Sequence, residues 1–225
     1  MSEDILIYAN KFSAGFAEKK VLHSISFKIY SNKINVIVGP GNSGKSTIID
    51  NIRGTNFLKD YFWFKGDFKS KVERFSFMPQ KSTNLNYSIK DKISDFDIKL
   101  KEIWFEEEEI YSLLINNIDI PLNKLNKSIE RLAHLSILLS ENTDILILDE
   151  PETHDFYYLE KLIKKLLSLK NKKTLIINTH NIYLAKSISD YVTFIRFGKL
   201  VESSERHKFF KSDNPLVIDI LETGC

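Results

Sequence analysis

The sequence lacks the features that stabilise or anchor several classes of protein. Its 225 residues include a single cysteine, Cys225, which excludes a framework of disulfide bonds and favours a reducing compartment. No stretch of 18 residues is free of charged side chains, so we expect no membrane-spanning helix. The first residues, Met1 to Asp4, are acidic and precede no apolar segment of the signal-peptide kind. Any role at a membrane is therefore expected to depend on a partner.

The sequence also lacks an excess of either charge. Lys and Arg number 32 against 30 Asp and Glu, a formal net charge of +2, which is too balanced for a nucleic-acid-binding surface. We expect no direct contact with nucleic acid. Apolar residues make up 43% of the chain, enough for a packed core. Because no internal repeat or low-complexity linker divides it, we predict one domain over residues 1–225.

Glycine is scarce, with 8 residues, yet three of them lie within residues 39–47. The segment reads Gly39-Pro40-Gly41-Asn42-Ser43-Gly44-Lys45-Ser46-Thr47 and fits the phosphate-binding pattern GxxxxGK[ST] at every fixed position. A predicted strand over Ile34–Val38 precedes it, and a helix-compatible run over residues 46–53 follows. We expect Gly39, Gly41 and Gly44 to let backbone N–H groups converge on an anion, with the helix N-terminus adding positive charge.

The last residues of this segment are the ones expected to contact the phosphates and a metal ion. We expect Lys45 to reach the β- and γ-phosphates and the hydroxyl of Ser46 to bind Mg²⁺. The alternative is a glycine-rich turn that precedes Lys-Ser by chance, and it leaves the flanking strand and helix unexplained. The sequence therefore predicts binding of a nucleoside triphosphate.

A second polar group follows another buried strand. The apolar run Ile145–Leu148 leads directly into Asp149 and Glu150, which places both carboxylates at the carboxyl edge of a sheet. We expect Asp149 to hold Mg²⁺ and Glu150 to polarise the water that attacks the γ-phosphate. Two solvated acids that cap a strand are the alternative, which the phosphate loop disfavours. The second acid favours hydrolysis over transfer to a substrate.

Two more strand ends carry a histidine and a glutamine. The strand Thr174–Ile177 leads to His180, which we expect at the γ-phosphate, although a lone histidine is more often structural. The short strand Arg74–Met78 leads to Gln80. We expect Gln80 to reach the metal or the attacking water and to report occupancy to the segment that follows it.

The remaining pattern divides the chain into three parts. Strands predicted over Ile5–Tyr8 and Ser24–Ile29 form an antiparallel layer. Residues 81–124 are charged and helix-compatible. Helices alternate with apolar strands over residues 125–201, which indicates a largely parallel sheet, and residues 191–202 predict a hairpin around Gly198.

Taken in order, GPGNSGKST, a glutamine after a strand, LILDEP and a strand-terminal histidine resemble the ATP-binding cassette (ABC) family over residues 4–202. The resemblance implies an α/β fold, with a P-loop NTPase (RecA-like) core, an N-terminal antiparallel β layer and a helical subdomain at about residues 81–140. It implies ATP and Mg²⁺ as ligands. It also implies a head-to-tail dimer in which each ATP lies between one phosphate loop and the partner's signature motif. The family's adenine-stacking aromatic corresponds best to Phe16, with Phe12 and Tyr8 as weaker candidates and a core aromatic as the alternative.

Two segments depart from the family pattern. Its signature LSGGQ should lie 24 residues before Asp149, where the sequence reads Leu125-Asn126-Lys127-Ser128-Ile129 and only the leucine matches. Without glycines a partner's γ-phosphate cannot approach this backbone closely, although the side chains of Asn126, Lys127 and Ser128 remain as donors. We therefore favour a heterodimer with an intact cassette over a homodimer. The run 152–156, Glu-Thr-His-Asp-Phe, stands where SALD or NHLD would be usual. The overlapping run EPETH, residues 150–154, is similar to ABC-like ATPases outside transport, such as RecF-related and overcoming-lysogenisation nucleases.

The resemblance implies an ATP-hydrolysing subunit of an ABC transporter, peripheral on the cytoplasmic face through a separate transmembrane permease. The alternatives are a non-transport ATPase acting on nucleic acid or protein assembly, and a nucleotide-dependent regulatory switch. Only 44 residues, 81–124, separate Gln80 from the altered signature, too few for the coiled coils of DNA-repair members. The complete set of Lys45, Gln80, Asp149, Glu150 and His180 disfavours the switch.

An aromatic cluster stands beside an acidic run in the helical segment. Trp104, Phe105 and Ile110 flank Glu106–Glu109. They predict either a surface that docks a partner or, as the favoured alternative, the core of the subdomain beside a solvated acidic face.

Overall fold

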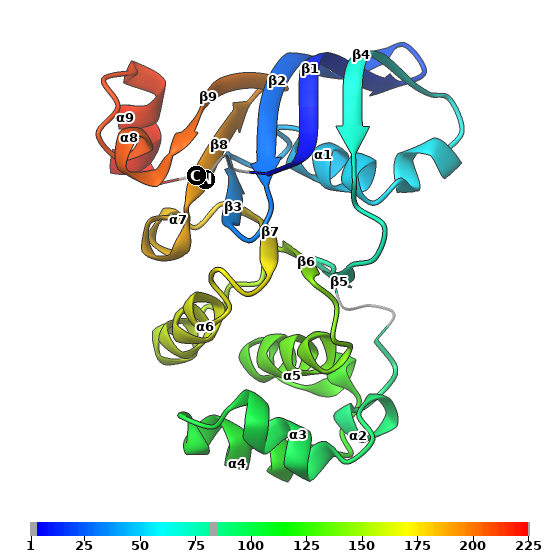
Figure 1. The fold of residues 1–225 in the computed structure, drawn as a ribbon, viewed down its shortest axis with the longest axis vertical. Coiled ribbons are helices and arrows are strands. Elements are labelled where there is room, and N and C mark those ends of the chain that lie inside the picture. The colour runs from blue at the N-terminus through cyan, green and yellow to red at the C-terminus, as the bar shows by residue number, and fades with distance from the viewer. Residues whose placement is uncertain (1–3, 82–84, 225) are drawn as a thin grey trace.

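A computed structural model describes residues 4–81 and 85–224 of the chain. Cys225, the first three residues and residues 82–84 of the charged segment lie outside the described part. The fold consists of two sheets with helices around them (Figure 1). No helix in the described ranges has the length and apolar character needed to cross a membrane.

The first sheet is antiparallel, with strands in the order β2-β1-β4. It consists of β1 (Ile5–Phe16), β2 (Lys19–Tyr30) and β4 (Phe62–Ser70). This confirms the antiparallel N-terminal layer, although β1 and β2 are longer than the sequence pattern predicted. The pattern missed β4 because most of its residues are exposed; pairing with β1, rather than an apolar alternation, makes this edge segment a strand.

The second sheet has six strands in the order β5-β6-β7-β3-β8-β9, all parallel except for the antiparallel pair β8–β9. Its strands are β3 (Ile34–Val38), β5 (Ser76–Met78), β6 (Ile145–Asp149), β7 (Thr174–Thr179), β8 (Tyr191–Arg196) and β9 (Lys199–Glu205). Every residue of β3, β6 and β7 is buried, because both faces of this sheet are covered. The predicted parallel sheet and C-terminal hairpin are thereby confirmed.

The helices fall into three groups along the chain. One lies next to the phosphate loop, a set follows β5, and the others follow β6, β7 and β9. They are α1 (Lys45–Ile52), α2 (Ile89–Lys92), α3 (Phe96–Ile103), α4 (Glu108–Asn116), α5 (Lys127–Ser140), α6 (Phe156–Ser168), α7 (Ile182–Ile188), α8 (Arg206–Phe209) and α9 (Pro215–Thr223), with the 3-10 turns η1 (Thr55–Leu58) and η2 (Leu122–Lys124). Helices α2 to α5 gather at the end of the molecule away from the antiparallel sheet (Figure 1).

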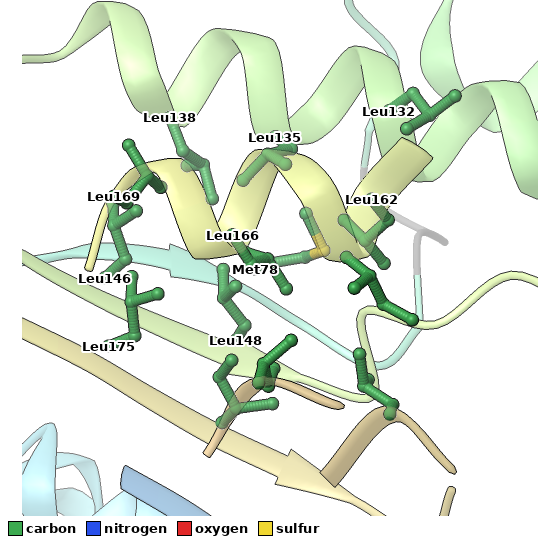
Figure 2. Packing of buried hydrophobic residues seen from close by; sticks show 14 of the residues in the cluster. Met78, Leu132, Leu135, Leu138, Leu146, Leu148, Leu162, Leu166, Leu169 and Leu175 are labelled. Carbon is green, nitrogen blue, oxygen red and sulfur yellow. The ribbon is translucent and has the colours of Figure 1, made fainter. Parts of the chain in front are cut away.

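The alternation of side chains along the parallel strands divides the core into two layers. Val36 and Leu148 belong to a cluster with the residues of α5 and α6, whose leucines pack over the strands in Figure 2. Ile37 and Ile147 point to the opposite face, where they meet α1 and the antiparallel sheet. The six-stranded sheet is thus held between two apolar layers, which fixes the positions of its strand ends.

The helical segment has its own buried anchor. Trp104 is 2% exposed and its Nε1 donates to Ser136 Oγ on α5 at 2.8 Å. Ile110 is fully buried, whereas Phe105 is 82% exposed. The hypothesis that Trp104 and Ile110 dock a partner is therefore wrong, and the alternative of a subdomain core holds. The acidic face is not merely solvated, because Glu107 forms ion pairs with two lysines of α6.

Candidate nucleotide site

The sequence-predicted polar residues meet because their strands are neighbours. The parallel register pairs Val38 with Thr179 and Asp149 with Asn178, so the strands end at one edge. The phosphate loop follows β3, and the other candidate side chains follow β5, β6 and β7. Four segments far apart in the sequence thereby converge at the carboxyl edge of the sheet, where α/β proteins bind ligands.

Two glycines of the phosphate loop are required by its geometry. Gly39 has a φ of 152°, and a Cβ added there would lie 2.0 Å from the carbonyl oxygen of Ile195. Gly44 has a φ of 103°, and its Cβ would meet Leu22 at 2.7 Å. Gly41 differs: its φ is not positive and a Cβ would meet nothing within 4 Å. The prediction that all three glycines shape the backbone is wrong for Gly41 in this structure.

Lys45 is folded onto the loop that carries it. The side chain is buried, and its Nζ donates to the carbonyl oxygens of Gly39 at 2.6 Å and Pro40 at 2.9 Å. The neighbouring Ser43 Oγ is also buried and has no hydrogen-bond partner in the described part of the chain. An unpaired buried hydroxyl is costly, and a bound anion would satisfy it. The loop therefore presents the positive charge of Lys45 and the hydroxyl donor of Ser43, both suited to binding an anion.

Asp149 is the most buried acid of the site. It ends β6 with 8% exposure, and burial raises the pKa of its carboxyl, an effect opposed by the amide of Asn178 and the charge of Lys45. Asn178 Nδ2 donates to Asp149 Oδ1 across the two strand ends. Sequence reasoning gave Asn178 no role, although its place at the end of an apolar strand was a signal.

Glu150 contacts two other predicted residues directly, Gln80 and His180. Its Oε2 accepts from Gln80 Nε2 at 2.6 Å, and its Oε1 lies 3.1 Å from His180 Nδ1. The backbone of Glu150 has a φ of 51°, a left-handed conformation that costs a non-glycine residue about 1 kcal/mol or more. Such backbone strain is common where a side chain must be aimed at a ligand.

A cleft of about 510 Å³ lies over the phosphate loop. Its lining contains Gln80, Glu150, Asn178 and loop residues 41–47, as well as residues that the sequence did not mark: Lys19, Lys20, Val21, His23, Phe197 and Gly198. The volume is in the usual range for small-molecule sites. A larger hollow of about 600 Å³ beside Arg206 contains none of the predicted site residues.

Phe16 is not among the residues that line this cleft. It ends β1, where its ring packs on Phe62 with centroids 5.4 Å apart, and Lys59 Nζ lies 5.5 Å from its ring centre. The weaker candidate Phe12 is wrong, because it is 1% exposed and belongs to the core. The adenine-stacking role of Phe16 stays a prediction.

Arg131 is a site residue that sequence reasoning missed. This arginine of α5 is 1% exposed, and its guanidinium donates to the carbonyl oxygens of Pro79 at 2.7 Å and Gln80 at 2.5 Å. Burial lowers its pKa, and the nearby carboxylates oppose that effect. The sequence did contain a signal for Arg131, because this charged residue lies between the apolar positions Ile129 and Leu132 of the predicted helix. An arginine that is buried with such neighbours needs hydrogen-bond partners.

The altered signature forms the start of α5. Asn126 caps the helix, with its Oδ1 accepting from the backbone N–H of Ile129 at 2.9 Å, and Lys127 Nζ lies 3.0 Å from Glu130 Oε2. The side-chain oxygen of Asn126 is therefore engaged inside the chain. Donation by this segment to a partner's nucleotide remains a prediction.

The oxygen donors at the strand ends fit a hard cation. Within residues 4–81 and 85–224, no cluster of three or more His, Cys, Asp or Glu side chains is arranged to hold a metal ion. The predicted set instead combines the Asp149 carboxylate with the oxygens of Ser46 and Gln80. Mg²⁺ is usually bound in this way, by one or two carboxylates together with water and substrate phosphates.

The chain is similar to known proteins over most of its length. A family model described as "ABC transporter" matches residues 22–153. The phosphate import ATP-binding protein PstB of Thermotoga maritima is 28% identical in an alignment 223 residues long, which covers 88% of this chain and 89% of that protein. PstB of Pyrobaculum aerophilum is 23% identical over 96% of this chain and 97% of that one.

Solved structures share the fold. A bacterial Atm1-family ABC exporter with ATP bound superposes with a TM-score of 0.77 at 18% identity, over 99% of this chain and 42% of the exporter chain. CbiO1 of Clostridium perfringens, part of the transporter complex CbiONQ, gives a TM-score of 0.69 at 17% identity, covering 98% of this chain and 96% of that one.

Proposed function

Because the chain belongs to the ABC transporter family, we propose specific roles in ATP hydrolysis for the residues at the carboxyl edge of its parallel sheet. The chain is an ATP-binding and ATP-hydrolysing subunit of an ABC transporter. The contact between Gln80, Glu150 and His180 beside the phosphate loop carries the proposal, because it unites residues separated by up to 100 positions at the place where a γ-phosphate would lie.

Binding is assigned to the loop of residues 39–47. Its backbone N–H groups and the N-terminus of α1 face an anion, and Lys45 exchanges its bonds to the loop carbonyls for bonds to phosphate oxygens. The unpaired Ser43 hydroxyl gains a partner in the same step. Phe16 is assigned to the adenine ring.

Hydrolysis is assigned to the residues that follow β5, β6 and β7. Glu150 takes a proton from the attacking water, Gln80 orients that water, and His180 donates to the γ-phosphate. Ser46, Gln80 and Asp149 would hold Mg²⁺, which neutralises charge on the phosphate oxygens when it is bound. Asn178 fixes the Asp149 carboxylate for that purpose.

We assign the chain as one domain over residues 1–225, with a helical subdomain at about 81–140. Its partners are proposed to be a transmembrane permease and a second ABC ATPase subunit, which would place it peripherally on the cytoplasmic face of a membrane. PstB relatives are named for phosphate import, and the permease would determine the substrate carried here. The nearly even charge supports the absence of direct nucleic-acid binding.

The test is ATP binding and hydrolysis by a Lys45→Ala variant, measured with a fluorescent ATP analogue and by phosphate release. Loss of charge-assisted bonds worth roughly 1.5–3 kcal/mol should weaken binding by about 10- to 150-fold. Lys69→Ala, an exposed lysine on β4, is the matched control and should bind ATP as the natural chain does. Unchanged binding by Lys45→Ala would contradict the assignment.

A further inference from the structure

The loop that follows Glu150 contains a second carboxylate of the site, Glu152. Its side chain is 9% exposed, which is unusual for a loop glutamate. Its Oε1 accepts from Thr179 Oγ1 at 2.6 Å, and the same hydroxyl oxygen accepts from the backbone N–H of Asn181 at 2.9 Å. These bonds tie the loop after β6 to the end of β7 and fix the carboxylate in place.

The fixed carboxylate faces the ring of His180. Glu152 Oε1 lies 3.5 Å from His180 Nδ1, while Glu150 Oε1 lies 3.1 Å from the same nitrogen. Nδ1 is thus placed between two acids, which leaves Nε2 as the ring nitrogen open to a nucleotide. A carboxylate beside one imidazole nitrogen fixes the orientation of the ring and the position of its proton.

The two acids have different surroundings. Glu150 is 20% exposed and also accepts from Gln80, whereas Glu152 is held by Thr179 and buried, so that burial raises the pKa of its carboxyl. Burial makes a charge there costly unless a donor faces it, and His180 is a titratable donor whose Nδ1 lies 3.5 Å from Glu152 Oε1. Because Nδ1 carries a single proton, it can donate a good hydrogen bond to only one carboxylate at a time. A hydrogen bond to Glu152 therefore leaves Glu150 without this donor.

We propose that Glu152 is a positioning residue of the ATPase. Its carboxylate, fixed by Thr179, accepts a hydrogen bond from Nδ1 of His180. As a result Nε2 faces the γ-phosphate, and Glu150 is free to act on the attacking water. The inference rests on the proposed function of Glu150 and His180. It gives the altered loop 152–156 a role within the site.

The test compares Glu152→Gln with the natural chain in steady-state ATP hydrolysis, alone and with a cognate cassette. Glutamine keeps an oxygen for the Thr179 hydroxyl but removes the charge that faces His180. We expect kcat to fall about tenfold with an unchanged KM for ATP. The matched control is Glu202→Gln on β9, a glutamate that also accepts from serine hydroxyls and lies outside the site; its kcat should not change.

A double-mutant cycle separates positioning from structure. In a His180→Ala background, Glu152→Gln should have no further effect on kcat, because the residue through which it acts is gone. The same loss in both backgrounds, an equal loss in Glu202→Gln, or full activity of Glu152→Gln would each overturn the inference. Absence of hydrolysis by the natural chain with its partner would instead overturn the proposed function, and the inference with it.

Discussion

Replacing Glu150 by glutamine separates ATP binding from ATP hydrolysis. The substitution conserves the shape of the side chain and removes its charge and its ability to accept a proton. One carboxylate oxygen accepts from Gln80 at 2.6 Å and the other lies 3.1 Å from His180 Nδ1. The amide oxygen can keep the bond from Gln80, so that the amide NH₂ faces His180.

The expected loss is larger for the reaction than for the fold. General-base catalysis contributes about 10²- to 10⁴-fold in rate, or roughly 2.7–5.5 kcal/mol of the barrier. In the variant the amide NH₂ of the glutamine would face the Nδ1 donor of His180. Such an unsatisfied pair of donors lowers the stability of the fold by about 1–3 kcal/mol when it is buried, and by less here because the Glu150 side chain is 20% exposed. We therefore expect kcat to fall at least a hundredfold while the chain stays folded.

The assay measures phosphate release at saturating ATP together with equilibrium binding of a fluorescent ATP analogue. Binding should be retained, since Lys45, Ser46 and Asp149 are untouched. Glu108→Gln, an acid at the start of α4 outside the cleft, is the matched control and should hydrolyse ATP at the natural rate.

Normal hydrolysis by Glu150→Gln in the presence of a partner cassette would refute the reasoning. It would mean that the contact with Gln80 and His180 does not mark the catalytic base. If the variant lost both binding and hydrolysis while its thermal unfolding midpoint was unchanged, the assignment of binding to the phosphate loop and of hydrolysis to the strand ends would be refuted.

Three other predictions concern stability and the dimer. Gly39→Ala should destabilise the fold by about 3 kcal/mol in urea titration, because its Cβ would lie 2.0 Å from a backbone oxygen, whereas Gly41→Ala, with open space around it, should be neutral. Burial lowers the pKa of His134 from 6.5 to about 4, so the folded state resists protonation. The free energy of unfolding should then fall by about 2 kcal/mol between about pH 7.5 and pH 5, a decrease that His134→Leu should remove and whose persistence in that variant would contradict the assignment. Substituting glycine for both Lys127 and Ser128 should raise hydrolysis by the isolated chain; an already brisk and unchanged rate would show that the altered signature is no handicap.

The sequence was informative wherever a local pattern carries its own chemistry. The run 39–47 and the apolar strands at Ile34–Val38 and Ile145–Leu148 were predicted within one or two residues of their observed bounds. Fully buried strands have uniform apolar composition, and glycine-rich loops have fixed spacing. The pattern missed β4 and the helices α8 and α9, whose signals are short or depend on pairing with distant segments.

Contacts between distant segments were beyond the reach of the pattern. Arg131 on α5 bonds the backbone of Gln80, and Asn178 holds Asp149, in each case because packing brings the elements together. Trp104 could have faced solvent or core, and its bond to Ser136 shows that it is core. Periodicity identifies which residues are apolar but not which neighbour covers them.

The sequence by itself determined the chemistry of the site: a phosphate loop, two acids, a glutamine and a histidine, each at the end of a strand. Only the tertiary structure decided which of these side chains touch. The order β5-β6-β7-β3 brings four strand ends together, and the loop after β6 turns Glu150 and Glu152 toward one histidine. Spacing along a chain fixes which residue types are available, whereas distances between side chains depend on strand order and packing, which are set by contacts between residues far apart in the sequence.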